Sequence, residues 1–99
     1  MYCIIYQFEV KPGLEAQFMK AWEKLTLFYR NECNSLGSRL HRESDLHYMA
    51  YAQWPSLEVY EAAGSKENTE TAQWSQQMRE ACNKVEALFK LESQMDYLL

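Results

Sequence analysis

The chain has 99 residues, of which 47% are hydrophobic and 24% are charged, and its net charge is −4. This size and composition predict a single globular domain over residues 1–99 and exclude a disordered or fibrous chain. The scattered acidic excess argues against a nucleic-acid or anionic-membrane partner, and no apolar run approaches the roughly 18 residues of a membrane span.

The chain opens with an alternating segment over residues 2–10. Its apolar positions on one side are Tyr2, Ile4, Tyr6, Phe8 and Val10. This period of two predicts a β-strand, and the absence of a basic, signal-like opening predicts a cytoplasmic protein. Pro12 and Gly13 end the strand, and an apolar stripe with a spacing of three and four then predicts a helix over residues 14–32.

Two further strands are predicted in the middle of the chain. Residues 34–37 form a turn, in which Gly37 suits the left-handed backbone that often follows a helix. Residues 38–43 then form a polar strand, and a turn at Ser44 and Asp45 connects it to a third strand over residues 46–54. The two strands are expected to form a hairpin.

The third strand is predicted to end in a sharp corner at Trp54. Pro55 biases Trp54 toward an extended backbone and offers no N–H to a strand ladder. Ser56 is the expected N-cap of a short helix over residues 57–63. An aromatic side chain fixed at such a corner either fills the core or forms the wall of a ligand pocket.

The last third of the chain predicts another helix and a final strand. Residues 64–71 form a polar connection, with Asn68 or Thr69 as the N-cap of the helix. The helix is expected to give way between Val85 and Leu91, and the strand to run from Leu91 to Leu99. The resulting β-α-β-β-α-β order is that of a ferredoxin-like α+β fold, with a four-stranded antiparallel sheet and helices on one face.

Both faces of the predicted sheet are apolar, although the helices can cover only one of them. The opposite face carries Ile5, Met49 and Tyr51, which would be a large exposed patch on a soluble monomer. We therefore predict a homodimer that forms through this sheet face.

The sequence lacks the usual catalytic and metal-binding motifs. It has no Gly-rich phosphate loop, no nucleophile elbow and no HExxH pattern. Cys3, Cys33 and Cys82 are odd in number and widely spaced, so we expect free thiols and no disulfide or zinc site. His41 and His47 lie at opposite ends of the hairpin strands and do not define a three-ligand geometry, so no metal is predicted.

A space between the sheet and the helices is the best candidate for a site. Ala50 and Ala52 leave room on the strand face that carries Trp54, and the surrounding side chains either fill it as core or bind a flat aromatic ligand. The predicted substrate-binding residues are Tyr6, Phe18, Trp22, Ala50, Ala52, Trp74, Met78 and Arg79.

Three segments of the chain carry a family likeness: Gly-Ser-Arg-Leu-His-Arg at 37–42, Ala-Tyr-Ala-Gln-Trp-Pro-Ser at 50–56 and Gln-Met-Asp-Tyr-Leu-Leu at 94–99. They resemble the antibiotic biosynthesis monooxygenase family of dimeric α/β barrels. The resemblance covers essentially the whole chain, and its most distinctive part is the corner at Trp54. It implies a homodimer with a pocket in each subunit and, as in some members, oxidation of quinols or polyketide phenols by dioxygen without a cofactor.

The resemblance also assigns roles to single residues. Trp54 matches the pocket Trp and Tyr60 matches the Tyr that follows it in polyketide-oxidising members, so these two are the predicted catalytic residues. Ala50 stands where those members carry an Asn, and Ala offers no donor to a phenolate oxygen. The Asn and the axial His of haem-degrading relatives fall near Tyr6 and Gly64, so no haem ligand is implied. We expect a cofactor-free monooxygenase acting on a quinol or phenol; the alternative is a non-catalytic homodimer with a filled or ligand-binding pocket.

Overall fold

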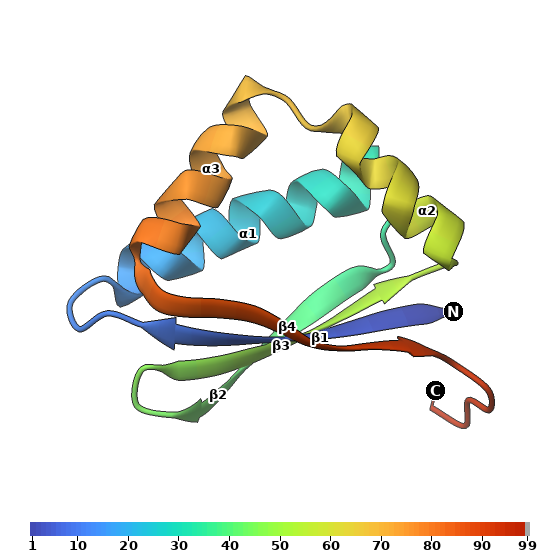
Figure 1. Cartoon of the computed structure of the whole chain (residues 1–99), viewed down its shortest axis with the longest axis horizontal. Helices are drawn as coiled ribbons and strands as arrows, with labels where there is room; N and C mark the ends of the chain where they lie inside the picture. Colours follow the sequence, from blue (N-terminus) through green and yellow to red (C-terminus); the bar gives the residue numbers. More distant parts are fainter. Residues whose placement is uncertain (99) are drawn as a thin grey trace.

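The computed structural model describes residues 1–98 and contains one four-stranded sheet with all helices on one face (Figure 1). In chain order the elements are β1 (Tyr2–Val10), α1 (Glu15–Glu32), β2 (Gly37–Ser44), β3 (His47–Trp54), α2 (Leu57–Ala62), the 3-10 helix η1 (Ala63–Lys66), α3 (Thr69–Glu80) and β4 (Cys82–Glu92). The strand order is β2-β3-β1-β4, and each neighbouring pair is antiparallel. The predicted ferredoxin-like α+β fold is therefore confirmed.

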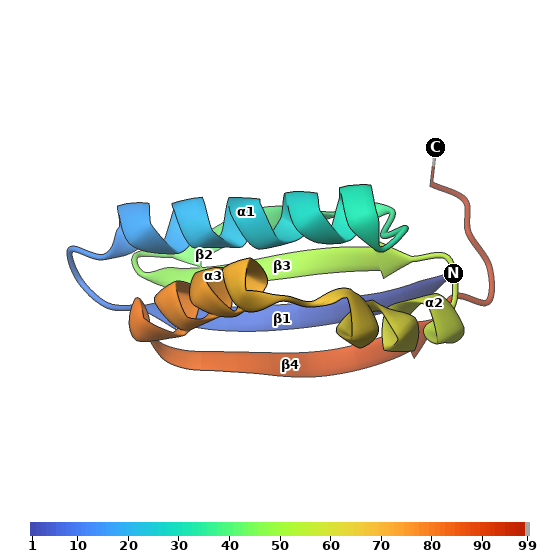
Figure 2. The ribbon, with the colours of Figure 1, turned by 90° about the horizontal axis from the view of Figure 1, so that it is seen from above.

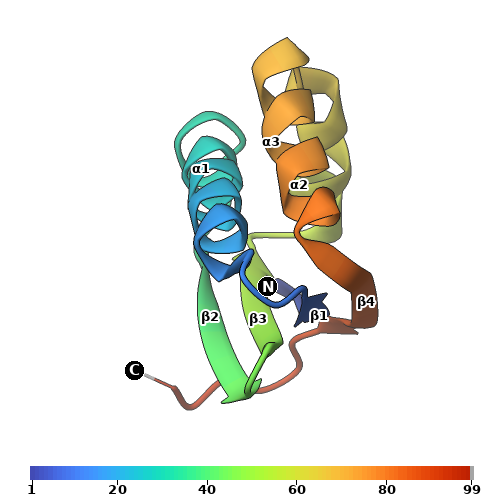
Figure 3. The same cartoon turned by 90° about the vertical axis from the view of Figure 1, so that its left-hand side faces the viewer.

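The helices form two rows above the sheet. From above, α1 lies over β2 and β3, whereas α2 and α3 lie over β1 and β4 (Figure 2). An end view shows the two rows standing side by side on the same face (Figure 3). Between them the rows cover the inner side of the sheet, where Ile4, Phe8 and Val10 of β1 are buried.

The predicted N-caps are present at the starts of both α2 and α3. Ser56 has an extended backbone, and its Oγ accepts the backbone N–H of Val59 at 3.2 Å. Asn68 caps α3: its Oδ1 accepts the Thr71 N–H at 3.0 Å, while Thr71 Oγ1 accepts the Asn68 N–H at 2.8 Å. This capping box satisfies N–H groups that the first turn of a helix leaves without partners.

The hairpin differs from the prediction at its turn. Leu46, predicted to begin the third strand, lies in the turn with φ 66°, and β3 begins at His47. Because β2 extends to Ser44, the turn consists of Asp45 and Leu46 and lies one residue further along the chain than predicted. Gly37 adopts the expected positive φ, at 106°.

The predicted boundary between the last helix and the last strand was wrong. The helix α3 ends at Glu80 and β4 runs from Cys82 to Glu92, so Val85 belongs to the strand. Residues 94–98 form no strand, and Leu99 lies outside the described residues. The register of β4 against β1 shifts between Ile5 and Tyr6, which interrupts the strand's alternation of side chains and hides the period of two.

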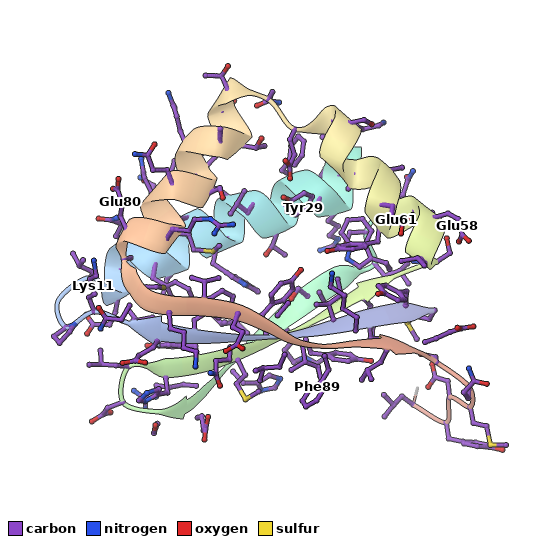
Figure 4. All side chains as sticks on the ribbon, viewed as in Figure 1. Lys11, Tyr29, Glu58, Glu61, Glu80 and Phe89 are labelled. Carbon is purple, nitrogen blue, oxygen red and sulfur yellow. The ribbon has the colours of Figure 1, made fainter. Side chains whose placement is uncertain are left out.

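The outer face of the sheet carries exposed apolar side chains. Phe89 is 57% exposed and points away from the helices, and Leu91 is 46% exposed (Figure 4). Beyond β4 the chain curls back beneath the sheet, where the Ser93 N–H donates to the carbonyl of Met1 at 2.9 Å (Figure 3). No helix within residues 1–98 is long and apolar enough to cross a membrane.

Candidate functional site

A cavity of about 410 Å³ lies between the inner face of the sheet and the helices. Its floor includes Tyr6 and Ala52, and its walls come from α1, the α2–η1 segment and α3. The lining is mostly aromatic and aliphatic with a few polar groups, which is typical of sites for small organic molecules.

The structure brings most of the predicted site residues together around this cavity. Those that line it are Tyr6, Trp22, Ala52, Trp54, Tyr60, Met78 and Arg79. Phe18 and Ala50 do not line it; both are buried in a cluster with Phe8 and Val10. Trp74 does not line it; the ammonium groups of Lys20 and Lys24 lie 6.0 and 5.8 Å from its ring. The binding role of each of these residues stays a prediction.

An aromatic wall forms at the corner where β3 ends. Trp54 is only 4% exposed, and its ring centroid lies 5.5 Å from that of Tyr60 and 5.9 Å from that of Tyr29, both edge-to-face. Such pairs add to the stability that burial of the rings provides. The corner therefore combines the two alternatives from the sequence, because Trp54 packs in the core and also forms part of the cavity wall.

The phenol group of Tyr6 at the cavity is held in its neutral form. Burial, followed by the nearby Tyr60 hydroxyl, raises the pKa of Tyr6 well above its ordinary range. The Tyr6 hydroxyl is consequently protonated at neutral pH and can donate a hydrogen bond to an anionic oxygen.

Sequence reasoning missed several polar residues at the cavity, among them Tyr29 and Glu67. Tyr29 Oη donates to Glu67 Oε1 at 2.7 Å, and both side chains line the cavity. Tyr29 is seven residues after Trp22, so helical spacing alone places the two on one face of α1 and could have identified it. Glu67 lies in the polar connection over residues 64–71, where no periodicity or motif in the sequence indicated a site.

The other candidate groups have structural surroundings. The three cysteines are free and buried, as predicted. His47 Nδ1 lies 3.3 Å from Ser44 Oγ and 3.1 Å from the carbonyl oxygen of Asp45, so it stabilises the hairpin turn. Across the described chain, no group of three or more His, Cys, Asp and Glu side chains is arranged to hold a metal ion.

Comparisons with known proteins agree with this architecture. A protein-family model described as antibiotic biosynthesis monooxygenase matches residues 1–74. A mutant of SnoaB, a cofactor-independent oxygenase from Streptomyces nogalater, has a similar structure, with a TM-score of 0.79 and 16% sequence identity. The match covers 97% of this chain and 95% of that chain. Rv0793 from Mycobacterium tuberculosis is similar at a TM-score of 0.78 and 12% identity, over 98% of each chain. The comparison with curated proteins gives no match.

Proposed function

Because the chain belongs to the antibiotic biosynthesis monooxygenase family, we propose that it oxygenates an electron-rich phenol or quinol with dioxygen, without a cofactor. The observation that carries this proposal is the cavity of about 410 Å³ walled by Trp54 and Tyr60. That volume suits a flat aromatic molecule of drug-like size. The similar fold of SnoaB, a cofactor-independent oxygenase, supports the choice of chemistry.

The substrate would lie between the aromatic wall and the floor of the cavity. Trp54 and Tyr60 offer ring surfaces at one side, and Trp22 and Met78 offer apolar contacts from α1 and α3. Ala52 leaves the floor clear because its side chain is a single methyl group. An aromatic ring held in this way would be shielded from much of the bulk water.

The reaction needs no electron source besides the substrate itself. A deprotonated phenol passes one electron to dioxygen, giving a phenoxyl radical and superoxide, which combine through a new C–O bond to a peroxide anion. This anion takes up a proton from solvent and becomes a hydroperoxide. Loss of water then leaves a quinone, with one oxygen atom in the product and the other in water. The protein's part is to bind the ring, to hold the phenolate and to exclude water.

The donors to the phenolate would come from outside β3. Ala50 carries no hydrogen-bond donor and is 1% exposed, within the packed cluster. Arg79 from α3 and the neutral hydroxyl of Tyr6 line the cavity instead. A cation and a neutral donor together can stabilise negative charge that develops on the substrate oxygen.

Incubation with a panel of naphthols and quinols, with and without oxygen, tests this function. We expect a quinone product only in air, with one atom of ¹⁸O from labelled dioxygen. Trp54→Phe should lower kcat/KM at least about tenfold, because it removes the indole N–H and part of the ring surface. Binding of the naphthols without any oxygen-dependent product would contradict the proposal and favour a non-catalytic ligand-binding protein.

We further propose that a second copy of the chain packs on the outer sheet face. Ile5 and Tyr51 are only half-buried there, next to the exposed Phe89. Light scattering at micromolar concentration should give the mass of a dimer, and Phe89→Asp should give a monomer. Leu27→Asp, at a similarly exposed position on α1, should leave the dimer intact. A monomeric wild type would contradict the proposal.

A further inference from the structure

Tyr29 and Glu67 connect the inside of the cavity to its outer side. Tyr29 lies above the sheet, within the frame of the three helices (Figure 4), and its half-buried ring packs against Trp54. Its hydroxyl donates to the exposed Glu67 at 2.7 Å. Both residues line the cavity and also a second hollow beside α3, so the pair spans the boundary between the two.

We propose that this pair is a proton relay that ionises the bound phenol, an inference that rests on the proposed function. The O–H bond of the substrate breaks and its proton passes to Tyr29 Oη. In the same step Tyr29 gives its own proton to Glu67, which afterwards releases it to water. The net result is a phenolate in the cavity and a proton in solvent, with Tyr29 and Glu67 restored.

The chemistry of the lining residues selects this pair. Oxygenation of a phenol requires removal of its proton, and a general base must lie within hydrogen-bond reach, directly or through a bridging group. Among the described residues that line the cavity, the carboxylates are Glu61 and Glu67, and there is no histidine. Glu67 is the one hydrogen-bonded to a phenol of the cavity wall.

Tyr29 suits the role of a relay and does not suit that of a base. Burial, followed by the hydrogen bond to Glu67 and the charge of that carboxylate, raises the pKa of Tyr29 well above its ordinary range. The phenol therefore keeps its proton at neutral pH and can accept one only while it gives one away. Tyr6 has a similarly raised pKa but no carboxylate partner among the hydrogen bonds of residues 1–98.

The backbone fixes Glu67 in place. It is the C-cap of η1, where its N–H donates to the Gly64 carbonyl at 3.4 Å, and it directly precedes Asn68 in the capping box of α3. These contacts define the backbone position of Glu67, and the hydrogen bond from Tyr29 Oη orients its carboxylate.

The charged and titratable groups around the pair come from several elements. Cys33 on the α1 side is close to both Tyr29 and Glu67, and Lys66 adjoins Glu67. Arg79 of α3 lines both hollows, and Tyr6 of β1 contributes to the raised pKa of Tyr29. Because Arg79 is a cation at the cavity, it can hold the substrate phenolate after the substrate's proton has left through Glu67.

A photoacid reports the relay directly and does not depend on oxygenation. Bound 2-naphthol, excited beyond the absorption of tryptophan, becomes a strong acid and emits as naphtholate only where an acceptor can take its proton within the excited-state lifetime. We expect strong naphtholate emission from the anaerobic wild-type complex. Tyr29→Phe keeps the ring and removes the hydroxyl, and Glu67→Gln keeps an acceptor oxygen and removes the base. Each should lower the ratio of naphtholate to naphthol emission by about tenfold or more.

Controls separate the relay from other effects of mutation. Glu70→Gln, at an exposed site in the first turn of α3, should leave the emission unchanged. In turnover, both relay variants should lose about 100-fold in kcat with a neutral quinol but little with a halogenated quinol that is already ionised at the assay pH. Undiminished naphtholate emission in both variants, or its loss in Glu61→Gln instead, would overturn the relay. Naphtholate emission that requires Tyr29 and Glu67, together with no oxygen-dependent product, would support the relay and reject the oxygenase function.

Discussion

Ala50 and Ala52 are two residues apart on the same face of β3, yet one lies in packed core and the other under a cavity. Ala50 belongs to the cluster of Phe8 and Phe18, whose ring centroids are 5.0 Å apart. Ala52 belongs to the cluster of Trp54 and lines the cavity. We call these the packed end and the open end of the inner sheet face.

The difference arises from what lies above each alanine. At the packed end, Phe18 of α1 and Ala81 after α3 both reach the sheet and are fully buried. At the open end, the chain leaves the sheet through α2 and returns only at α3 (Figure 1). The larger side chains there line a cavity without filling its centre. The same residue type on one strand is therefore covered by packed side chains at one end and faces a cavity at the other.

The largest effect is expected from emptying the packed end. Phe18→Ala removes a fully buried ring and should lower the free energy of unfolding by about 3–5 kcal/mol, as measured by urea denaturation. Met19→Ala, at the next residue but 46% exposed, should change it by less than about 0.5 kcal/mol. Similar effects of the two changes would contradict the description of the packed end.

Filling each end with the same side chain sharpens the comparison. Ala50→Leu forces a larger group into a dense cluster and should cost about 1–3 kcal/mol of stability. Ala52→Leu has the cavity in front of it and should leave stability nearly unchanged, while it weakens 2-naphthol binding about tenfold or more. Thermal unfolding and fluorescence titration of both variants measure the two effects. Equal destabilisation by both would show that the open end is not open.

The smallest expected effect is the pH dependence of the packed end. Burial raises the pKa of the Cys82 thiol to about 11, so the native state keeps a proton that the unfolded state loses near pH 9. This contribution is fully present below pH 9 and is lost as the pH rises toward 11. Cys82→Ala should remove about 1–2 kcal/mol of the fall in stability between pH 9 and 11, measured by denaturation at each pH. An unchanged slope would show that Cys82 titrates normally.

Local signals in the sequence predicted most of the fold. Alternation over residues 2–10 found β1, and the Pro55-Ser56 pair found the corner and the cap of α2. These signals are reliable because they depend on the backbone of a few neighbouring residues. The signal failed at β4, where the shifted register against Ile5 and Tyr6 depends on a partner strand far away in the sequence.

The sequence by itself determined the order of elements, the apolar character of both sheet faces and the aromatic corner at Trp54. It could do so because periodicity, turn residues and caps act over short distances. Only the tertiary structure decided that Ala50 is covered by Phe18 while Ala52 faces a cavity, since both outcomes fit the same alternating strand. It also decided that Tyr29 meets Glu67, 38 residues away. That contact requires α1 and the end of η1 to pack on the same sheet face, a long-range arrangement that no local pattern records.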